Sequence, residues 1–166
     1  MALSEGMYVP IRNEAGLIQG LQIRLDSTKN GNKYKWFSSR FRENGAGARA
    51  WLHTVNWDNG KNIFITEGGL KADIAAYFNP DVCYVGLSGV HCQSGIVPLL
   101  ERMGVKTAVE ALDMDKLSNI NVTNAATELK RKLFDAGISC ESFTWDTSFK
   151  GLDDYYQFCN YLDTAA

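Results

Sequence analysis

From residue 61 to residue 162, short apolar runs alternate with helical patterns, and this alternation limits the fold more than any other feature of the sequence. The apolar runs have the length of buried strands, and the segments between them carry apolar residues at helical spacing. Such alternation is typical of a parallel sheet with right-handed crossovers and helices on both faces. We therefore predict an α/β domain with a Rossmann-like parallel sheet of about four strands. The expected strands are 63–66, 82–87, 105–112 and 138–145, and the expected helices are 70–78, 94–103, 122–136 and 152–162.

The first of these strands runs directly into a glutamate. Residues 63–66 suit a buried strand, Glu67 follows, and two glycines precede the next helical pattern. Glu67 is therefore expected where a strand ends and a helix begins. Ligands bind at that edge in open α/β sheets. We interpret Glu67 as the centre of a carboxylate site.

A pair of acids follows the predicted third strand. Asp113 and Asp115 are separated by Met114. Residues i and i+2 of an extended segment point to the same side, so these two carboxylates can aim at one point. If this strand neighbours the one that ends at Glu67, the acids meet at one edge of the sheet, where clustered carboxylates suit Mg²⁺. An isolated Asp-x-Asp is more often a solvated turn, and Glu67 at a matching strand end is what favours a metal site here.

Residues 1–60 differ from the rest, and their short alternating runs and polar turns predict a small β-rich lobe ahead of the α/β domain at 61–166. Segment 50–57 is expected to form another strand of this lobe. A basic block lies in the lobe, although the whole chain has a net charge of −2. A polyanion bound at the junction of the two parts explains the block, and a solvated basic hairpin explains it equally well. Its seven basic residues are Arg24, Lys29, Lys33, Lys35, Arg40, Arg42 and Arg49.

The spacing of cysteine and histidine argues against a zinc site, because the four cysteines form no C-x-x-C pair and no His/Cys cluster of zinc spacing. No run approaches the ~20 apolar residues of a membrane span, and no signal peptide opens the sequence. We therefore expect a cytoplasmic protein without a membrane partner.

Three motifs in this order resemble a known family. A Glu-Gly pair after an apolar strand, followed by a strand that ends in Asp-x-Asp, resembles the TOPRIM domain of topoisomerases, bacterial primases and some nucleases. Segment 149–156, Phe-Lys-Gly-Leu-Asp-Asp-Tyr-Tyr, is similar to the segment that closes the primase version. Segments 10–13, 20–24 and 33–39 resemble the lobe that precedes TOPRIM in primases, where basic residues line a nucleic-acid or nucleotide groove. The resemblance covers almost the whole chain and is strongest to primase-like proteins of phages, plasmids and mobile elements.

The resemblance implies a centre that binds one or two Mg²⁺ or Mn²⁺ ions. Glu67, Asp113 and Asp115 match the metal-binding acids of the family. Asp153 matches an acid that binds a second metal or supports the first, and Lys150 matches the basic residue before it.

Several positions depart from the family pattern. The next acid of the family usually lies nearer the glutamate, whereas here Lys71 stands in its place and Asp73 is the nearest candidate. Gly151 stands where primases often have another aspartate, and the Asp-Gly-Asp-x-x-Gly form is absent. These departures concern the second metal and the identity of the reaction.

The implied reaction is phosphoryl transfer, in which Mg²⁺ neutralises phosphate oxygens and aligns the attacking hydroxyl. The leading hypothesis is a primase-like nucleotidyltransferase core that acts in DNA replication of a phage, plasmid or mobile element. The alternatives are a TOPRIM nuclease, a non-catalytic nucleic-acid-binding module and a generic nucleotide-binding domain. The expected partners are a single-stranded DNA template, NTPs and a helicase domain or protein. The residues expected to hold phosphates are Arg24, Lys33, Lys35, Arg40, Lys71 and Lys150, although a solvated surface position explains Lys71 equally well.

Overall fold

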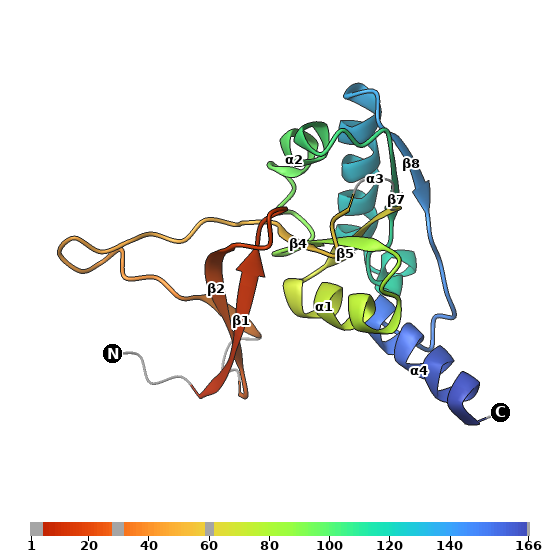
Figure 1. Cartoon of the computed structure of the whole chain (residues 1–166), viewed down its shortest axis with the longest axis horizontal. Coiled ribbons are helices and arrows are strands. Elements are labelled where there is room, and N and C mark those ends of the chain that lie inside the picture. Colours follow the sequence, from red (N-terminus) through yellow and green to blue (C-terminus); the bar gives the residue numbers. More distant parts are fainter. Residues whose placement is uncertain (1–4, 28–31, 59–61, 166) are drawn as a thin grey trace.

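The computed structural model describes residues 5–27, 32–58 and 62–165. A small antiparallel sheet of three strands, in the order β1-β2-β3, forms the N-terminal lobe (Figure 1). Its strands pair as two successive hairpins, which agrees with the β-rich lobe expected from the alternating sequence. The strands are β1 (Gly6–Arg12), β2 (Ile18–Leu25) and β3 (Tyr34–Trp36).

The larger sheet has five strands in the order β4-β6-β5-β7-β8. Four of them run parallel to one another, and β4 runs antiparallel to β6 at one edge. The α/β fold with a mostly parallel sheet is therefore confirmed. The strands are β4 (His53–Val55), β5 (Ile63–Glu67), β6 (Cys83–Leu87), β7 (Thr107–Glu110) and β8 (Ser139–Ser142).

Helices cover both faces of this sheet, with α2 and α3 on one side and α1 and α4 on the other (Figure 1). Successive strand side chains point to opposite faces, so the central strands β5 and β6 each contribute to two cores. Ile65 and Val85 pack in the core that holds α2 and α3, whereas Phe64 and Tyr84 face α1 and α4. The helices are α1 (Gly69–Phe78), α2 (Ile96–Arg102), α3 (Ile120–Asp135) and α4 (Leu152–Ala165), and a 3₁₀ turn, η1, spans Met114–Leu117.

One predicted strand belongs to a different sheet from the one expected. Segment 50–57 was expected in the lobe, but its strand β4 pairs with β6 of the larger sheet. A strand of three residues has little preference of its own, and pairing with the buried β6 decides its place. The boundary expected between residues 60 and 61 and the basic residue Lys29 lie outside the described residues. The division into 1–60 and 61–166 therefore stays a prediction.

No helix within residues 5–27, 32–58 and 62–165 combines the length and the apolar character needed to cross a bilayer.

Candidate functional site

Glu67 is the last residue of β5, and a glycine pair turns the chain directly into α1. Gly68 has φ of 84°, a conformation that favours glycine because it has no side chain. The turn also packs on the neighbouring strand, since a Cβ at Gly86 would lie 2.6 Å from the carbonyl oxygen of Gly68. Glycine at these positions therefore brings the half-buried Glu67 to the carboxyl edge of the sheet.

Asp113 and Asp115 lie at the same edge, after the parallel strand β7. They do not continue an extended strand, as the sequence analysis expected, because Asp113 caps the η1 turn and Asp115 lies within it. The turn buries Met114 and still lets both acids reach one cation. The Lys150 Nζ lies 2.8 Å from Asp115 Oδ2 and 3.7 Å from Asp113 Oδ2.

Lys71 projects from the first turns of α1 and binds the more deeply buried acid. Its Nζ donates to both carboxylate oxygens of Asp113 at 2.6 Å. The Asp113 side chain is 1% exposed and the Lys71 side chain is 25% exposed. Lys71 therefore pairs with Asp113, and it does not occupy the solvated surface position that the sequence analysis also considered.

Asp153 at the start of α4 completes the group of acids. A Cβ at Gly151 would lie 2.1 Å from Asp153 Oδ1 and 3.3 Å from Lys71 Nζ, so Gly151 leaves room for both charged groups. Two oxygens at this edge, Asp115 Oδ1 and Asp153 Oδ1, are buried and have no hydrogen-bond partner among the described residues. We call the four acids Glu67, Asp113, Asp115 and Asp153 the acidic cluster.

The pKa values of the acidic cluster show its crowding. Burial raises the pKa of Glu67, and the nearby charges of Asp113 and Asp115 raise it further, against the opposing effect of Lys71 and Lys150. Burial also raises the pKa of Asp153, and Lys71 is the largest influence that lowers it. The hydrogen bond to Asp115 raises the pKa of Lys150. Burial is thus the main cause of the raised pKa of Glu67 and of Asp153, and four carboxylates share this edge with the two lysines.

The N-terminal lobe also reaches the acidic cluster. Burial raises the pKa of Tyr34, the positive charges of Arg24 and Lys71 lower it, and Asp153 and Glu67 raise it. Arg24 and Tyr34 are directly opposite each other on β2 and β3, so their side chains share one face of the small sheet. Sequence reasoning missed Tyr34, and the only signal for it was its place inside a short basic strand.

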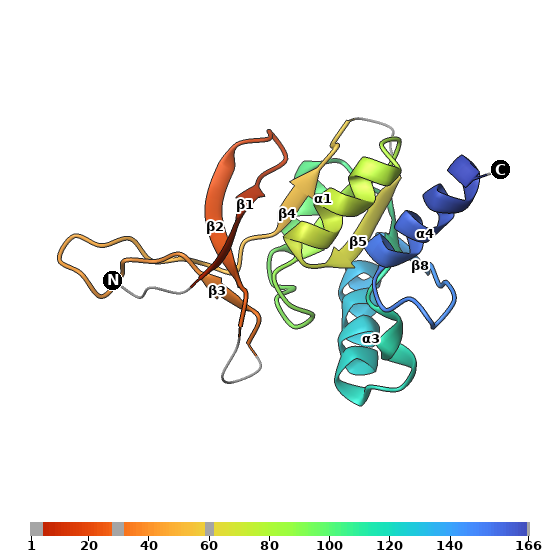
Figure 2. The same ribbon diagram turned by 90° about the horizontal axis from the view of Figure 1, so that it is seen from below.

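The other predicted basic residues point elsewhere. Lys35 lies between Tyr34 and Trp36 on β3 and so faces the opposite side of the small sheet. Lys33 precedes this strand and is exposed. Arg40 lies on the loop between β3 and β4, which Figures 1 and 2 show projecting from the lobe away from the larger sheet. Lys71 and Lys150 therefore contact the acidic cluster, and Arg24 lies beside Tyr34 on the small sheet. Lys33, Lys35 and Arg40 lie outside the cluster.

A buried histidine fastens the lobe to the α/β domain. His53 Nδ1 accepts a hydrogen bond from the backbone N–H of Arg12 at 3.0 Å, so Nε2 carries the proton and donates to Asp73 Oδ1 at 3.0 Å. The Arg12 guanidinium lies 3.5 Å from the same oxygen. Asp73, considered as a further acid of the site, is thus engaged at the junction of the lobe with α1.

Glu110, which sequence reasoning also missed, anchors the loop that carries Asp113 and Asp115. It is 1% exposed, and its Oε1 accepts hydrogen bonds from the Leu112 N–H and from Lys116 Nζ, both at 2.8 Å. Its Oε2 accepts from Ser142 Oγ at 2.8 Å. Because Lys116 belongs to η1, this network ties the turn to the sheet and fixes the direction of the two aspartates.

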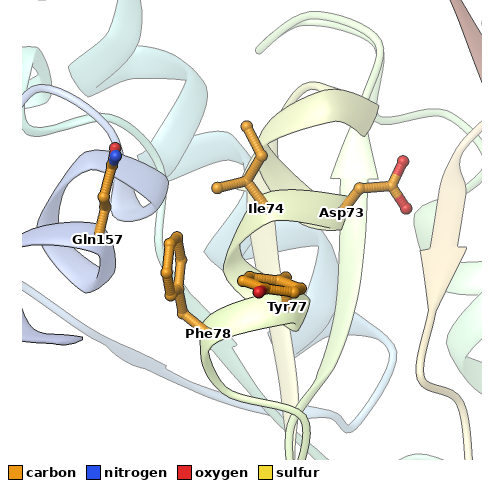
Figure 3. Close-up of a pocket in the computed structure, with 5 residues that line it drawn as sticks. All are labelled: Asp73, Ile74, Tyr77, Phe78 and Gln157. Atoms are coloured by element: carbon orange, nitrogen blue, oxygen red, sulfur yellow. The ribbon is translucent and has the colours of Figure 1, made fainter. Parts of the chain in front are cut away.

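A cavity of about 390 Å³ lies away from the acidic cluster. It is formed between α1 and α4, and its lining is mostly apolar (Figure 3). No member of the acidic cluster lines it. The lining residues are Asp73, Ile74, Tyr77, Phe78 and Gln157.

The acidic cluster, as arranged, does not fit a divalent ion. Within residues 5–27, 32–58 and 62–165, no three His, Cys, Asp or Glu side chains are placed to hold one metal. Mg²⁺ needs oxygen ligands at about 2.0–2.1 Å. Both oxygens of Asp113 are already bonded to an ammonium group, which has to move before a metal can bind there. Binding of Mg²⁺ or Mn²⁺ by the four acids stays a prediction.

Comparisons with known proteins find likeness in structure but not in sequence. No protein-family model and no curated protein matches this chain. The zinc-binding and RNA polymerase domains of the Aquifex aeolicus primase superpose with a TM-score of 0.64 at 13% identity, over 96% of this chain and 40% of that one. The DnaG primase catalytic domain bound to ssDNA superposes with a TM-score of 0.63 at 16% identity, over 93% of this chain and 49% of that one.

The chain thus spans less than half the length of either primase structure. At these identities the likeness concerns the fold, and the TOPRIM assignment stays a resemblance based on the motifs. The arrangement of a small antiparallel lobe before a mostly parallel α/β sheet is the fold of primase domains.

Proposed function

We propose that this chain is a primase-like module that binds single-stranded DNA in DNA replication. The observation that carries the proposal is the surface of the lobe. Arg24, Lys33, Lys35, Arg40, Arg42 and Arg49 are all exposed there. Phosphate contacts by such side chains supply most of the affinity for a polynucleotide and make it sensitive to salt. The similar primase domain that was solved with ssDNA supports the choice of ligand.

The projecting loop of the lobe adds a stacking surface. Phe41 is 88% exposed and lies between two arginines, and the guanidinium of Arg40 lies 4.5 Å from the centre of its ring. Hydrogen bonds between Ser39 and Ala46 close the loop and hold its tip in place. An exposed aromatic ring flanked by cations is the arrangement on which unpaired bases stack. Sequence reasoning did not single out Phe41.

The path of the bound single-stranded DNA follows from these positions. From the loop, the DNA would pass along the lobe to Arg24 and Tyr34, and then to the lysines at the acidic cluster. Lys150 is 63% exposed and already faces solvent. Lys71 and Lys150 offset part of the charge of the four acids, which weakens the repulsion that a phosphate would meet at this edge.

The test is binding of labelled single-stranded DNA, followed by fluorescence anisotropy over a range of salt. Phe41→Ala should weaken binding by about 1–3 kcal/mol, the usual contribution of one stacked base. Phe134→Ala is the matched control, since Phe134 is 81% exposed but lies on α3. Arg24→Ala should lower the salt slope by about 0.7, as expected for one lost phosphate contact. Equal loss in the Phe41 and Phe134 variants, or no binding by the wild type, would refute the proposal.

Mg²⁺-dependent nucleotidyl transfer is the second candidate, and two unpaired oxygens favour it. Asp115 Oδ1 and Asp153 Oδ1 are buried without a hydrogen-bond partner, which a cation would correct. As the acidic cluster is arranged, the Lys71 ammonium bonds to both oxygens of Asp113, so this candidate requires Lys71 to leave that carboxylate before an ion binds. Incubation with labelled single-stranded DNA, Mg²⁺ and NTPs separates the outcomes: extension products indicate a primase-like enzyme and cleavage products a nuclease. The Asp113→Ala, Asp115→Ala double variant should abolish either activity. A helicase partner and a phage or plasmid setting stay predictions.

A further inference from the structure

The contact between Lys71 and Asp113 is the tightest charged contact at the carboxyl edge of the sheet. One ammonium nitrogen lies 2.6 Å from both oxygens of a carboxylate that is 1% exposed. The two residues are 42 positions apart in the sequence, so the pairing depends on the fold and not on a local turn. A buried carboxylate is costly unless a positive charge compensates it, and here the chain itself supplies that charge.

The surroundings of Lys71 are shaped for its ammonium group. Gly151 provides the space, because a Cβ there would lie 3.3 Å from Lys71 Nζ. The neighbouring acid Asp153 is also influenced by Lys71, which lowers its pKa against the effect of burial. The positive charge of Lys71 also lowers the pKa of Glu67, so its ammonium acts on Asp113, Asp153 and Glu67 from one position.

A divalent ion and this ammonium group exclude each other. A metal at Asp113 would need the oxygens that Lys71 occupies, and the two positive charges would repel at that distance. The only other lysine in contact with these acids, within the described residues, is Lys150, whose side chain is 63% exposed and can move into solvent. The side chain of Lys71 is 25% exposed and has much less freedom to leave.

We propose that Lys71 is the built-in cation of the acidic cluster, which takes the place of a divalent ion at Asp113 and masks a metal site. The inference goes beyond the proposed binding function, because it concerns which cation the cluster holds and not whether DNA binds. It makes two statements that can be measured. The wild-type chain binds divalent ions weakly, and removal of the ammonium group creates affinity for them.

The experiment is a titration with Mn²⁺ alone, followed by electron paramagnetic resonance of the unbound ion. Lys71→Met keeps most of the length of the side chain and removes its charge. This variant should bind Mn²⁺ at least about tenfold more tightly than the wild type, or about 1.4 kcal/mol. Lys71→Arg keeps the charge and should resemble the wild type. Lys150→Met is the matched control, because it removes a contact to the same acids from an exposed position, and its gain should be clearly smaller.

Addition of Asp113→Asn to Lys71→Met should remove the gained affinity, since it removes the unmasked ligand. Equal Mn²⁺ affinity in the wild type and in Lys71→Met would overturn the inference, as would an equal gain in Lys71→Met and Lys150→Met. If Lys71→Met does not fold, the wild type and Lys71→Arg decide the question. Stoichiometric Mn²⁺ binding by the wild type at micromolar concentration contradicts a masked site. Absence of such binding in both the wild type and Lys71→Arg supports a masked site. DNA binding in EDTA is measured separately, so failure of the proposed function and failure of this inference are distinguishable.

Discussion

Replacement of Lys116 by methionine tests whether the network around Glu110 holds the loop of the acidic cluster. Lys116 Nζ lies 2.8 Å from Glu110 Oε1, and the two side chains are 8% and 1% exposed. Loss of one partner from a buried ion pair costs about 3–5 kcal/mol, because the other charge stays buried. Two hydrogen bonds to Glu110, from the Leu112 N–H and from Ser142 Oγ, remain in the variant. We therefore expect a loss near the lower limit, about 3 kcal/mol.

A chain of this size loses about 2–4 °C in Tm for each kcal/mol, so Lys116→Met should lower the Tm by about 6–12 °C. The measurement is thermal unfolding followed by circular dichroism, with urea unfolding as a check that the transition stays two-state. Lys130→Met is the matched control, since Lys130 approaches the same carboxylate at 3.9 Å but is 42% exposed. An exposed pair contributes at most about 1 kcal/mol.

The double variant Lys116→Met, Glu110→Gln separates the charge from the packing. If the buried charge causes the loss, removal of both charges should recover at least about 1 kcal/mol relative to the sum of the single variants. If the loss comes only from the packing of the Lys116 side chain, the two effects add. Additive effects, or a loss in Lys116→Met no larger than that in Lys130→Met, would show that our account of this network is wrong.

Three further predictions concern the edge of the sheet and the junction with the lobe. Gly86→Ala should cost about 2–3 kcal/mol in urea unfolding, because its Cβ would lie 2.6 Å from the Gly68 carbonyl oxygen, whereas Gly47→Ala, with only one atom at 3.9 Å, should change stability by less than about 0.5 kcal/mol. Glu67→Gln should raise the Tm at pH 7. Burial raises the pKa of Glu67 above its ordinary 4.5, so ionisation of Glu67 destabilises the folded state above that pKa. The gain in Tm should vanish as the pH falls below 4.5, where Glu67 is protonated in both the folded and the unfolded chain. A gain that persists at low pH would contradict this account. His53→Leu should lower the free energy of unfolding by about 1–3 kcal/mol in thermal unfolding, since it leaves the Arg12 N–H and the Asp73 carboxylate without their buried partner. The same loss in Arg12→Met would exclude a special role for His53.

The periodicity of the sequence was sufficient to predict the order of helices and strands in the α/β domain. Alternating apolar runs and helical patterns predicted β5, α1, β6, α2, β7, α3, β8 and α4 in the observed order. The position of Glu67 after a strand and before two glycines was also evident, because strand length and glycine are local signals. β4 was assigned to the wrong sheet, since a strand of three residues carries no signal for its partner.

The sequence by itself indicated that Glu67, Asp113 and Asp115 reach the carboxyl edge, because their distance from a strand end is a property of the local chain. Asp153 was expected only from the family resemblance. The sequence did not determine what holds these acids. Lys71 pairs with Asp113 across 42 positions of the sequence. Lys116 of η1 binds Glu110 of β7 only because the chain turns back after the strand. Tyr34 of the lobe comes within the electrostatic influence of Glu67 and Asp153, and His53 joins the backbone of β1 to Asp73 of α1. The partner of a charged side chain depends on which elements become neighbours, and only the tertiary structure decides that.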